Sequence, residues 1–260
     1  MNYQTLVITK KDDNTTVALN RPDVHNAMNE ILMDELTRCF QQLSSDDSVT
    51  TIILTGNGKS FCAGADLTWM KKMVTYSQDE NKKDSRLLLD MYETIHSCPK
   101  PVIGRINGAA FGGGIGLLAV CDITITVPEV TFAFSEVKLG IIPAVISTFV
   151  ASRMTPAAMR RLFITGERFD SATAQKIGLI DIIVAPEKLD ETINSCIEQV
   201  HSSGPHAIKE VKHLIYNLQK MDIKEYKEFA VEKISELRVS QEGQEGIKGF
   251  LEKRKPSWRK

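Results

Sequence analysis

The sequence predicts an α/β fold built from repeated strand–strand–helix units and followed by a region that contains only helices. Up to about residue 186, short β-branched runs end at glycine-rich turns and alternate with segments of helical apolar spacing. Beyond Pro186 the strand signal disappears and helical segments follow one another. We therefore expect an α/β core over residues 1–186 and a helical region over residues 187–260, although no sequence repeat is visible.

Individual elements follow from apolar spacing and from the residues that start and stop helices. The predicted strands are Leu6–Thr9, Thr15–Leu19, Val49–Thr55, Pro101–Ile106, Asp122–Val127 and Val130–Phe134. The predicted helices cover residues 27–43, 87–97, 187–203, 206–219 and 223–239, with short helices after Gly112, from Pro156 and from Ser171. Asn26 is the expected cap of the first helix, and the Lys-rich stretch 71–83 is expected to be mobile. Arg105 interrupts an apolar strand, so it either pairs with an acid or approaches a ligand.

The composition is that of a globular protein with a substantial core. The chain has 260 residues, of which 42% are hydrophobic and 25% charged. Its net charge of -1 indicates neither a nucleic-acid partner nor a membrane-surface partner, and its apolar runs are far shorter than a membrane span. The first residues lack the layout of a secretory signal. We expect a soluble, cytoplasmic protein.

Five cysteines occur at scattered positions, and no CxxC pair is present. The pattern predicts neither a disulfide framework nor a zinc site, and the histidines also lack the spacing of metal ligands. Cys62 lies beside a loop of small residues, but no histidine is near it in the sequence. We therefore expect Cys62 to pack in the core rather than to act as a nucleophile.

Two loops of small residues indicate chemistry: Phe61–Asp66 has the sequence FCAGAD and Phe111–Gly116 has the sequence FGGGIG. Each follows a hydrophobic strand, and the second leads directly into a short helix. Glycine-rich backbone at a helix N-terminus can direct N–H groups at a ligand oxygen. Two such loops can form an oxyanion hole, which stabilises developing charge in acyl chemistry. We therefore expect an enzyme that acts on a thioester or a similar carbonyl.

Nucleotide-binding motifs do not account for these glycines. A GxGxxG fingerprint requires a glycine where Leu117 stands, and a phosphate loop ending at Gly58-Lys59-Ser60 requires one at Ile53, inside a strand. After the first loop, Asp66 fits the N-cap of a helix that starts near Leu67. Trp69 and Met70 then lie on its first turns, where they either line an acyl pocket or pack in the core.

Several motifs, in matching order and spacing, resemble the crotonase family, which is the enoyl-CoA hydratase/isomerase superfamily. They are Leu19–Pro22, His25–Ala27, Phe61–Asp66, Asn107–Gly114, Cys121-Asp122, Ser135–Pro143 and Gly166–Phe169, followed by Ala174 and Gly178-Leu179. The resemblance covers nearly the whole chain. It implies a crotonase-like spiral of strand–strand–helix units, whose C-terminal helical region assembles trimers or dimers of trimers.

The resemblance also implies roles for residues of the two loops. The backbone N–H groups of Ala65 and Gly113 match the family's oxyanion donors, which hold a thioester oxygen as it becomes an enolate. The implied contacts to coenzyme A come from His25, Ala27, Ala63, Gly64, Asp66, Leu67 and Gly112. No separate cofactor is implied, because coenzyme A arrives as part of the acyl-CoA substrate.

Hydratases of this family place two glutamates around one water. The second glutamate matches Glu136, whereas Gly116 stands at the position of the first. Glu136 is therefore left as a single acid/base that moves a proton at C2 or C3 of the acyl chain. We expect Phe132, Phe134 and Ile142 to enclose its carboxyl and to raise its pKa toward the working range.

A single glutamate is compatible with more than one reaction. The candidates are hydration of a substrate whose own polar group replaces the missing acid, Δ3–Δ2 double-bond isomerisation, and another family chemistry such as hydrolysis or decarboxylation. Residues 65–70 and 137–147 resemble the methylglutaconyl-CoA hydratase branch, whose substrates carry a distal carboxylate that Lys71 or Lys72 could meet. We expect a hydratase of an enoyl-CoA, with an isomerase or a catalytically silent acyl-CoA-binding protein as alternatives.

Overall fold

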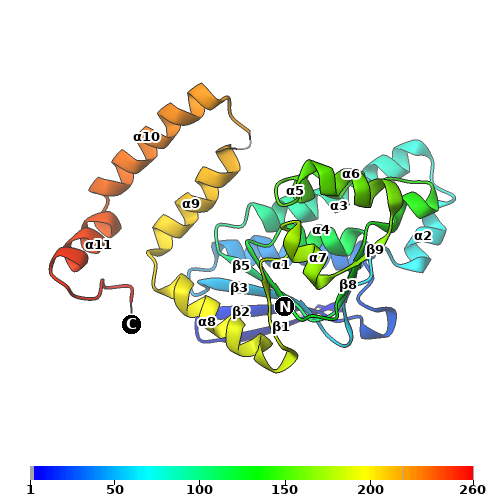
Figure 1. Ribbon diagram of the computed structural model, residues 1–260, viewed down its shortest axis with the longest axis horizontal. Coiled ribbons are helices and arrows are strands. Elements are labelled where there is room, and N and C mark those ends of the chain that lie inside the picture. Colours follow the sequence, from blue (N-terminus) through cyan, green and yellow to red (C-terminus); the bar gives the residue numbers. More distant parts are fainter. Residues whose placement is uncertain (1–2, 219, 260) are drawn as a thin grey trace.

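The computed structural model describes residues 3–218 and 220–259 and has the α/β architecture expected from the sequence (Figure 1). The larger sheet has six strands in the order β1-β2-β3-β5-β7-β10, and the smaller sheet has four in the order β4-β6-β8-β9. In the larger sheet β1 and β2 form the expected antiparallel hairpin, and all the following neighbours are parallel.

From β3 to β8, successive strands alternate between the two sheets. The larger sheet contains β1 (Leu6–Lys11), β2 (Asn14–Leu19), β3 (Thr51–Gly56), β5 (Val102–Ile106), β7 (Ile123–Thr126) and β10 (Ile182–Ile183). The smaller sheet contains β4 (Ser60–Cys62), β6 (Ala109–Phe111), β8 (Thr131–Ala133) and β9 (Arg168–Asp170). The pairs β3–β4, β5–β6 and β7–β8 each contribute one strand to each sheet and are each followed by helices. The strand–strand–helix unit predicted from the sequence is thereby confirmed.

Helices fill the connections between these strand pairs. They are α1 (Glu30–Ser45), α2 (Leu67–Met73), α3 (Gln78–His96), α4 (Gly113–Ala119), α5 (Ala144–Ala151), α6 (Pro156–Thr165) and α7 (Ser171–Lys176). The described chain also contains three short 3-10 helices, which are η1 (Pro22–Val24), η2 (Ser135–Leu139) and η3 (Pro186–Lys188). Pro156 opens α6 as expected, and the side chain of Thr155 caps it by accepting from the N–H of Ala158.

The expected cap of the first helix is wrong. α1 begins at Glu30, and the side chain of Asn29 accepts from the N–H of Leu32. Asn26 instead has a φ of +56°, in the left-handed region that Asn tolerates better than most residues. The chain between these two asparagines is therefore not helical, and it remains free to contact the FCAGAD loop.

The Lys-rich stretch 71–83 is helical over most of its length, which corrects the expectation of a mobile segment. α2 ends at Met73, and α3 already begins at Gln78. Ser77 and Glu80 form a capping box, in which each side chain bonds the other residue's backbone N–H. This S-x-x-E signature is visible in the sequence, so the helix start could have been recognised there.

Side chains cover both faces of the larger sheet. In β3, Ile52 and Leu54 join the main core together with α1, and Ile53 points to the opposite face as strand alternation requires. On that face Ile53 packs in a second cluster with residues of β5, β7 and α8 (Leu189–His201). The second face is thus covered by α8 over β3, β5 and β7, whereas Val7 of β1 remains 41% exposed.

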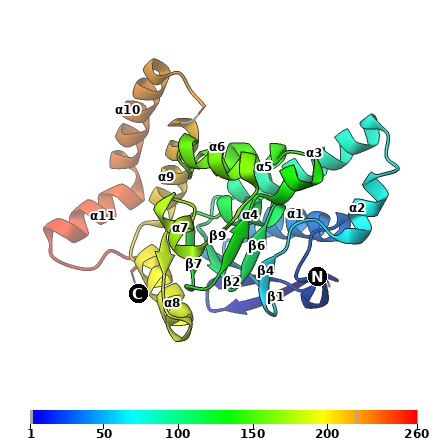
Figure 2. The ribbon, with the colours of Figure 1, turned by 45° about the vertical axis from the view of Figure 1, so that its right-hand side comes forward.

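Three helices beyond α8 form an arm that extends away from the core (Figures 1 and 2). They are α9 (Pro205–Leu218), α10 (Ile223–Val239) and α11 (Gln241–Leu251). The predicted break at Gly204-Pro205 is confirmed, and α11 is an addition to the prediction. The last residue of the predicted helix 206–219, Gln219, lies outside the described residues.

One ion pair joins this C-terminal arm to the core, because Nζ of Lys212 lies 2.6 Å from Oδ2 of Asp122. Many large apolar side chains of the arm are exposed. They are Val211, Ile215, Leu218, Ile223, Val231, Ile234, Val239, Ile247, Phe250 and Leu251. No helix within residues 3–218 and 220–259 is long and apolar enough to cross a membrane.

Candidate active site

Three neighbouring strands of the smaller sheet end at the segments that are expected to carry the chemistry. β4, β6 and β8 are parallel, so their carboxyl ends meet at one edge of the sheet. β4 leads into Ala63–Asp66, β6 leads into Gly112–Gly114, and β8 leads into η2 with Glu136. Ligands of α/β proteins typically bind beyond the carboxyl ends of parallel strands. The topology therefore gathers the predicted catalytic residues from three distant parts of the sequence.

The two loops of small residues are in direct contact. A Cβ on Gly64 would lie 2.9 Å from the carbonyl oxygen of Phe111 and 3.9 Å from the nitrogen of Gly113. The φ of Gly64 is +90°, a conformation that glycine adopts without steric cost. Only a residue without a side chain lets the two loops approach this closely.

The N–H groups of Ala65 and Gly113 have no hydrogen-bond acceptor within the described part of the chain. Met28 donates to the carbonyl of Gly64 at 2.7 Å and accepts from the N–H of Asp66 at 2.8 Å. The N–H of Ala65, between these two, therefore faces away from Met28. Gly113 is the first residue of α4, where an N–H has no partner inside the helix. Ala65 is exposed and Gly113 is half-buried, so both groups are accessible to a ligand.

The carboxyl of Glu136 lies against the glycine triplet. A Cβ on Gly112 would be 3.1 Å from its Oε1, and its Oε2 is buried without a hydrogen-bond partner among the described residues. Burial raises the pKa of Glu136 above its ordinary value of 4.5, as expected. Phe132 and Phe134 are fully buried in the core, but Ile142 is 73% exposed and points mostly to solvent. A half-buried carboxyl with one buried, unpaired oxygen is suited to accept and release a proton.

The side chains of Tyr92 and Ile146 occupy the space beside Gly116, where the family resemblance implies a first glutamate. A Cβ on Gly116 would lie 2.7 Å from Cζ of Tyr92, 2.8 Å from its hydroxyl oxygen and 2.5 Å from Cγ2 of Ile146. The hydroxyl of Tyr92 donates to the carbonyl oxygen of Gly113 at 2.7 Å. This role of Tyr92 could not be predicted from the sequence, because Tyr92 is one of several core-facing positions on α3.

The segment implied to contact coenzyme A is bound to the FCAGAD loop. The N–H of Ala63 donates to the carbonyl of His25 at 3.0 Å, and a ring nitrogen of His25 lies 2.9 Å from Oγ of Ser60. The side-chain amide of Asn26 donates to the carbonyl oxygen of Ser60 at 2.9 Å. His25 is exposed and Ala27 is buried, so the exposed part of this segment adjoins the loop of Ala65.

Asp66 has the predicted N-cap role and a second partner besides. Its carboxylate accepts from the N–H groups of Thr68 and Trp69, and its Oδ2 lies 2.7 Å from a guanidinium nitrogen of Arg21. Burial alone would raise the pKa of Asp66, but the hydrogen bonds from Arg21 and the two backbone groups hold it below its ordinary value. Leu67, the next residue, is 76% exposed at the mouth of this loop. Arg21 belongs to a motif seen in the sequence, but no role was predicted for it.

The structure also defines the surroundings of three residues near the first loop: Trp69, Met70 and Cys62. The indole N–H of Trp69 donates to Asp84 at 3.1 Å inside the core, which decides between the two roles considered for Trp69. Met70 is half-buried. Cys62 is fully buried, and burial raises the pKa of its thiol to about 12, so it packs in the core as expected.

The cations singled out in the sequence differ in their surroundings. Nζ of Lys72 lies 2.8 Å from the carboxylate of Glu30, whereas Lys71 is exposed on α2. Nε of Arg105 lies 2.7 Å from Oδ1 of Asp190 on α8. Of the two possibilities left open for Arg105, the structure favours the pairing with an acid.

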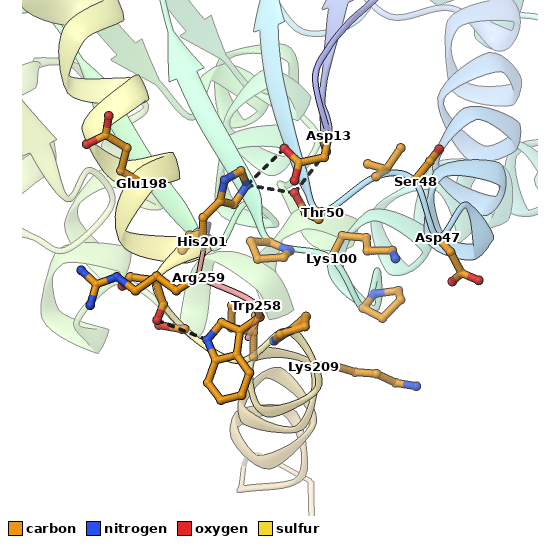
Figure 3. Close-up of a pocket in the computed structure, with 18 of the residues that line it drawn as sticks. Asp13, Asp47, Ser48, Thr50, Lys100, Glu198, His201, Lys209, Trp258 and Arg259 are labelled. Carbon is orange, nitrogen blue, oxygen red and sulfur yellow. Dashed lines mark hydrogen bonds and ion pairs between the residues drawn. The ribbon is translucent and has the colours of Figure 1, made fainter. Parts of the chain in front are cut away.

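A cavity of about 990 Å³ lies elsewhere, between the C-terminal helices and the edge of the core (Figure 3). Trp258 and His201 line it, and a ring nitrogen of His201 lies 2.9 Å from Oγ1 of Thr50 and 3.7 Å from Oδ1 of Asp13. None of the site residues predicted from the sequence lines this cavity. The candidate site is therefore defined by the residues that meet at the smaller sheet and not by this cavity.

Comparison with known proteins shows the family to which the chain belongs. The chain matches the family model described as Enoyl-CoA hydratase/isomerase over residues 11–260. A short-chain-enoyl-CoA hydratase of Clostridium acetobutylicum is 32% identical over 257 residues, which are 98% of this chain and 97% of that protein. A crotonyl-CoA hydratase of Syntrophomonas wolfei is 30% identical over 260 residues, covering 99% of each.

Solved structures agree with this match. The crystal structure of an enoyl-CoA hydratase from Shewanella pealeana has a TM-score of 0.94 at 36% identity and covers 98% of this chain and 96% of that chain. The chain therefore belongs to the enoyl-CoA hydratase/isomerase family of enzymes and has the crotonase fold.

Proposed function

We propose that this enzyme adds water to the C2–C3 double bond of an enoyl-CoA, with Glu136 as its acid/base. One observation carries the proposal: the unpaired, buried carboxyl oxygen of Glu136 lies at the turn of the glycine triplet. The Clostridium and Syntrophomonas relatives, which are named as hydratases of enoyl-CoA and crotonyl-CoA, support the same reaction.

In the proposed reaction, the N–H groups of Ala65 and Gly113 hold the thioester oxygen. Glu136 as carboxylate takes a proton from water, the hydroxyl adds to C3, and the electron pair of the double bond moves to form the enolate. The protonated Glu136 then gives its proton to C2, which restores the thioester carbonyl. Each oxyanion donor is expected to contribute about 3–4 kcal/mol to the barrier reduction. Coenzyme A enters with the substrate, and we propose no separate cofactor.

For the acyl group we propose a branched or carboxylated chain, such as that of 3-methylglutaconyl-CoA. The support is the resemblance of residues 65–70 and 137–147 to that branch of the family. Lys72 already pairs with Glu30, so Lys71 is the better candidate to meet a distal carboxylate. A Lys71→Ala, Lys72→Ala double variant whose KM for a carboxylated acyl-CoA equals that of the wild type would remove this assignment.

Δ3–Δ2 isomerisation is the second candidate, because Gly116 leaves one carboxyl and an isomerase has to move only one proton. A third possibility is a silent protein that binds acyl-CoA without turnover. Incubation with crotonyl-CoA, 3-methylcrotonyl-CoA, 3-methylglutaconyl-CoA and a 3-enoyl-CoA separates the three. A product heavier by one water supports the hydratase, whereas a shifted double bond at constant mass supports the isomerase.

Glu136→Gln is the matched variant for this panel, since it keeps the size of the side chain and removes its proton transfer. We expect turnover to fall about 100-fold to 10,000-fold, with acyl-CoA binding retained. If the wild type binds these thioesters without converting any of them, and Glu136→Gln binds them equally well, the silent binding protein replaces the enzyme.

We further propose that the chain assembles as a homotrimer or a dimer of trimers through its C-terminal helices. The support is the row of exposed apolar side chains along α9, α10 and α11. Burial of such surface contributes roughly 25 cal/mol per Å². An unpartnered arm of this composition therefore favours association.

A further inference from the structure

We propose that Tyr92 is a positioning residue of this site, which occupies the space beside Gly116 and holds Gly113 in its reactive conformation. The inference rests on the proposed role of the Gly113 N–H as an oxyanion donor. Tyr92 lies on α3 (Gln78–His96), far in sequence from both loops, and its side chain is fully buried.

The hydroxyl of Tyr92 restrains the backbone of Gly113 directly. It donates to the Gly113 carbonyl oxygen at 2.7 Å, and a Cβ on Gly113 would lie 3.0 Å from it. Glycine has wide backbone freedom, so the direction of its N–H depends on what fixes its neighbours. On the other side of Gly113, the N–H of Gly112 donates to the carbonyl of Ala133 at 2.9 Å. Gly113 is thus held from the helix side by Tyr92 and from the strand side by Ala133.

Tyr92 and a side chain at residue 116 exclude each other. The ring carbon Cζ and the hydroxyl would lie 2.7 and 2.8 Å from a Cβ on Gly116, which is closer than real Cβ contacts. Tyr92, together with Ile146, therefore occupies the space beside Gly116, where the family resemblance implies a first glutamate. The missing acid and the buried tyrosine are two parts of one arrangement, in which a neutral hydrogen-bond donor replaces a carboxyl.

The surroundings keep this hydroxyl protonated. Burial, with Cys62 and Glu136 nearby, raises the pKa of Tyr92 well above its ordinary value. At physiological pH the phenol is therefore a hydrogen-bond donor and carries no charge that would repel an enolate. This is the protonation state that the bond to Gly113 requires.

Tyr92→Phe tests the inference, because it removes the hydroxyl and keeps the ring that fills the space beside Gly116. We expect kcat to fall about 10-fold to 100-fold, with KM changed less than about twofold. The infrared carbonyl stretch of a bound acyl-CoA should also move toward its frequency in water, because the oxyanion donors are less well aligned. Tyr226→Phe, on the remote helix α10 (Ile223–Val239), is the matched control and should leave both readouts unchanged.

Incorporation of 3-fluorotyrosine at residue 92 tests the hydroxyl in a fully folded protein, since it keeps both the ring and the donor. It should restore kcat and the carbonyl frequency to near wild-type values. Tyr92→Phe with wild-type kcat and carbonyl frequency overturns the inference and leaves the proposed function standing. If the wild type converts no acyl-CoA, the proposed function fails, and the carbonyl shift of the bound thioester still decides the role of Tyr92. If the carbonyl frequency of the bound thioester is the same in Tyr92→Phe as in the wild type, that role is overturned. If the frequency in Tyr92→Phe moves toward its value in water, the role is supported.

Discussion

The carboxyl of Glu136 on η2 lies directly against Gly112 at the start of α4: a Cβ on Gly112 would lie 3.1 Å from Oε1 and 3.4 Å from Cδ. The residue that follows Gly112 carries the proposed oxyanion donor. Proton transfer and charge stabilisation are therefore proposed to occur on the two sides of the same glycine. This leaves no room for a side chain between them.

Replacing Gly112 by alanine should impair turnover strongly. The new methyl group would press on the Glu136 carboxyl, and the φ of Gly112 is +49°, which strains any residue with a side chain. We expect kcat/KM to fall at least about 10-fold, measured with the acyl-CoA that the wild type converts.

Gly140→Ala is the matched control for that variant. Gly140 also has a positive φ, +75°, but nothing lies within 4 Å of its would-be Cβ. With a ψ of 16° it lies in the left-handed region, whereas Gly112 has a ψ of -119°. Gly140→Ala therefore places an alanine at a positive φ without the contact. Equal losses of kcat/KM in the two variants would show that the contact with Glu136 does not matter.

The pH dependence of the reaction should show the raised pKa of Glu136. Burial raises this pKa above 4.5, and the proposed mechanism begins with the carboxylate. As the pH falls, Glu136 in the free enzyme should take up its proton earlier than an exposed glutamate does, so kcat/KM should begin to fall above pH 4.5. A profile of kcat/KM that stays flat down to pH 4.5 in folded protein would contradict the assignment of Glu136 as the base.

Asp66→Ala should destabilise the protein and weaken substrate binding. It removes the cap of α2 (Leu67–Met73) and leaves the partly buried Arg21 unpaired, which together should lower the free energy of unfolding by about 2–4 kcal/mol. Asp170→Ala removes a cap from α7 (Ser171–Lys176) that carries no ion pair within the described chain, so it should cost only about 0.5–2 kcal/mol. Urea unfolding compares the two variants.

The contribution of Asp66 to the free energy of unfolding should fall as the pH is lowered. Its pKa in the folded protein lies below its ordinary value of 3.8. Folding therefore favours the charged form of Asp66. The resulting stabilisation is fully present above the pKa that Asp66 has in the unfolded protein, and it is lost as the pH falls through the pKa that Asp66 has in the folded protein. The difference between wild type and Asp66→Ala should shrink in acid, and a difference that grows there would contradict the pairing with Arg21.

Ile215→Glu should shift the assembly toward smaller species. Ile215 is 54% exposed on α9, so the change leaves the fold of the single chain intact and places a charge on the proposed contact surface. Lys227→Glu on α10 makes a larger change in charge, -2 against -1, without removing an apolar side chain. Analytical ultracentrifugation compares the two variants, and a wild type that sediments as a single chain would rule out the proposed assembly.

Much of the order of the elements could be predicted from the sequence because the longer strands and most helices have local signals. The short strands β4, β6, β9 and β10 were not predicted, because two or three residues are too few to show an apolar pattern. Asn26 shows the limit of such signals. Its side chain bonds backbone carbonyls of Asn57 and Ser60, more than thirty positions away, and this outcompetes the local role of a cap. The capping box of Ser77 was a local signal that was missed. α11 contains Gly243, Gly246 and Gly249, which lower helix propensity and hide the helix.

The candidate site was predicted only in part, for a similar reason. The loops of Ala65 and Gly113 and the acid Glu136 stand in motifs that are visible in the sequence. Tyr92 does not, because its partner Gly113 lies 21 positions further along the chain and only tertiary packing brings them together. Arg105 was undecided because its partner Asp190 is 85 positions away.

The strands β4, β6 and β8 are each only three residues long. Inserting a single residue ahead of any of them would advance the chain by about 3.3 Å and turn alternate side chains to the opposite face. The reacting groups would then no longer meet. Length changes in this enzyme should be better tolerated in the connection between α2 and α3, which lies outside both sheets and does not set the position of β4, β6 or β8.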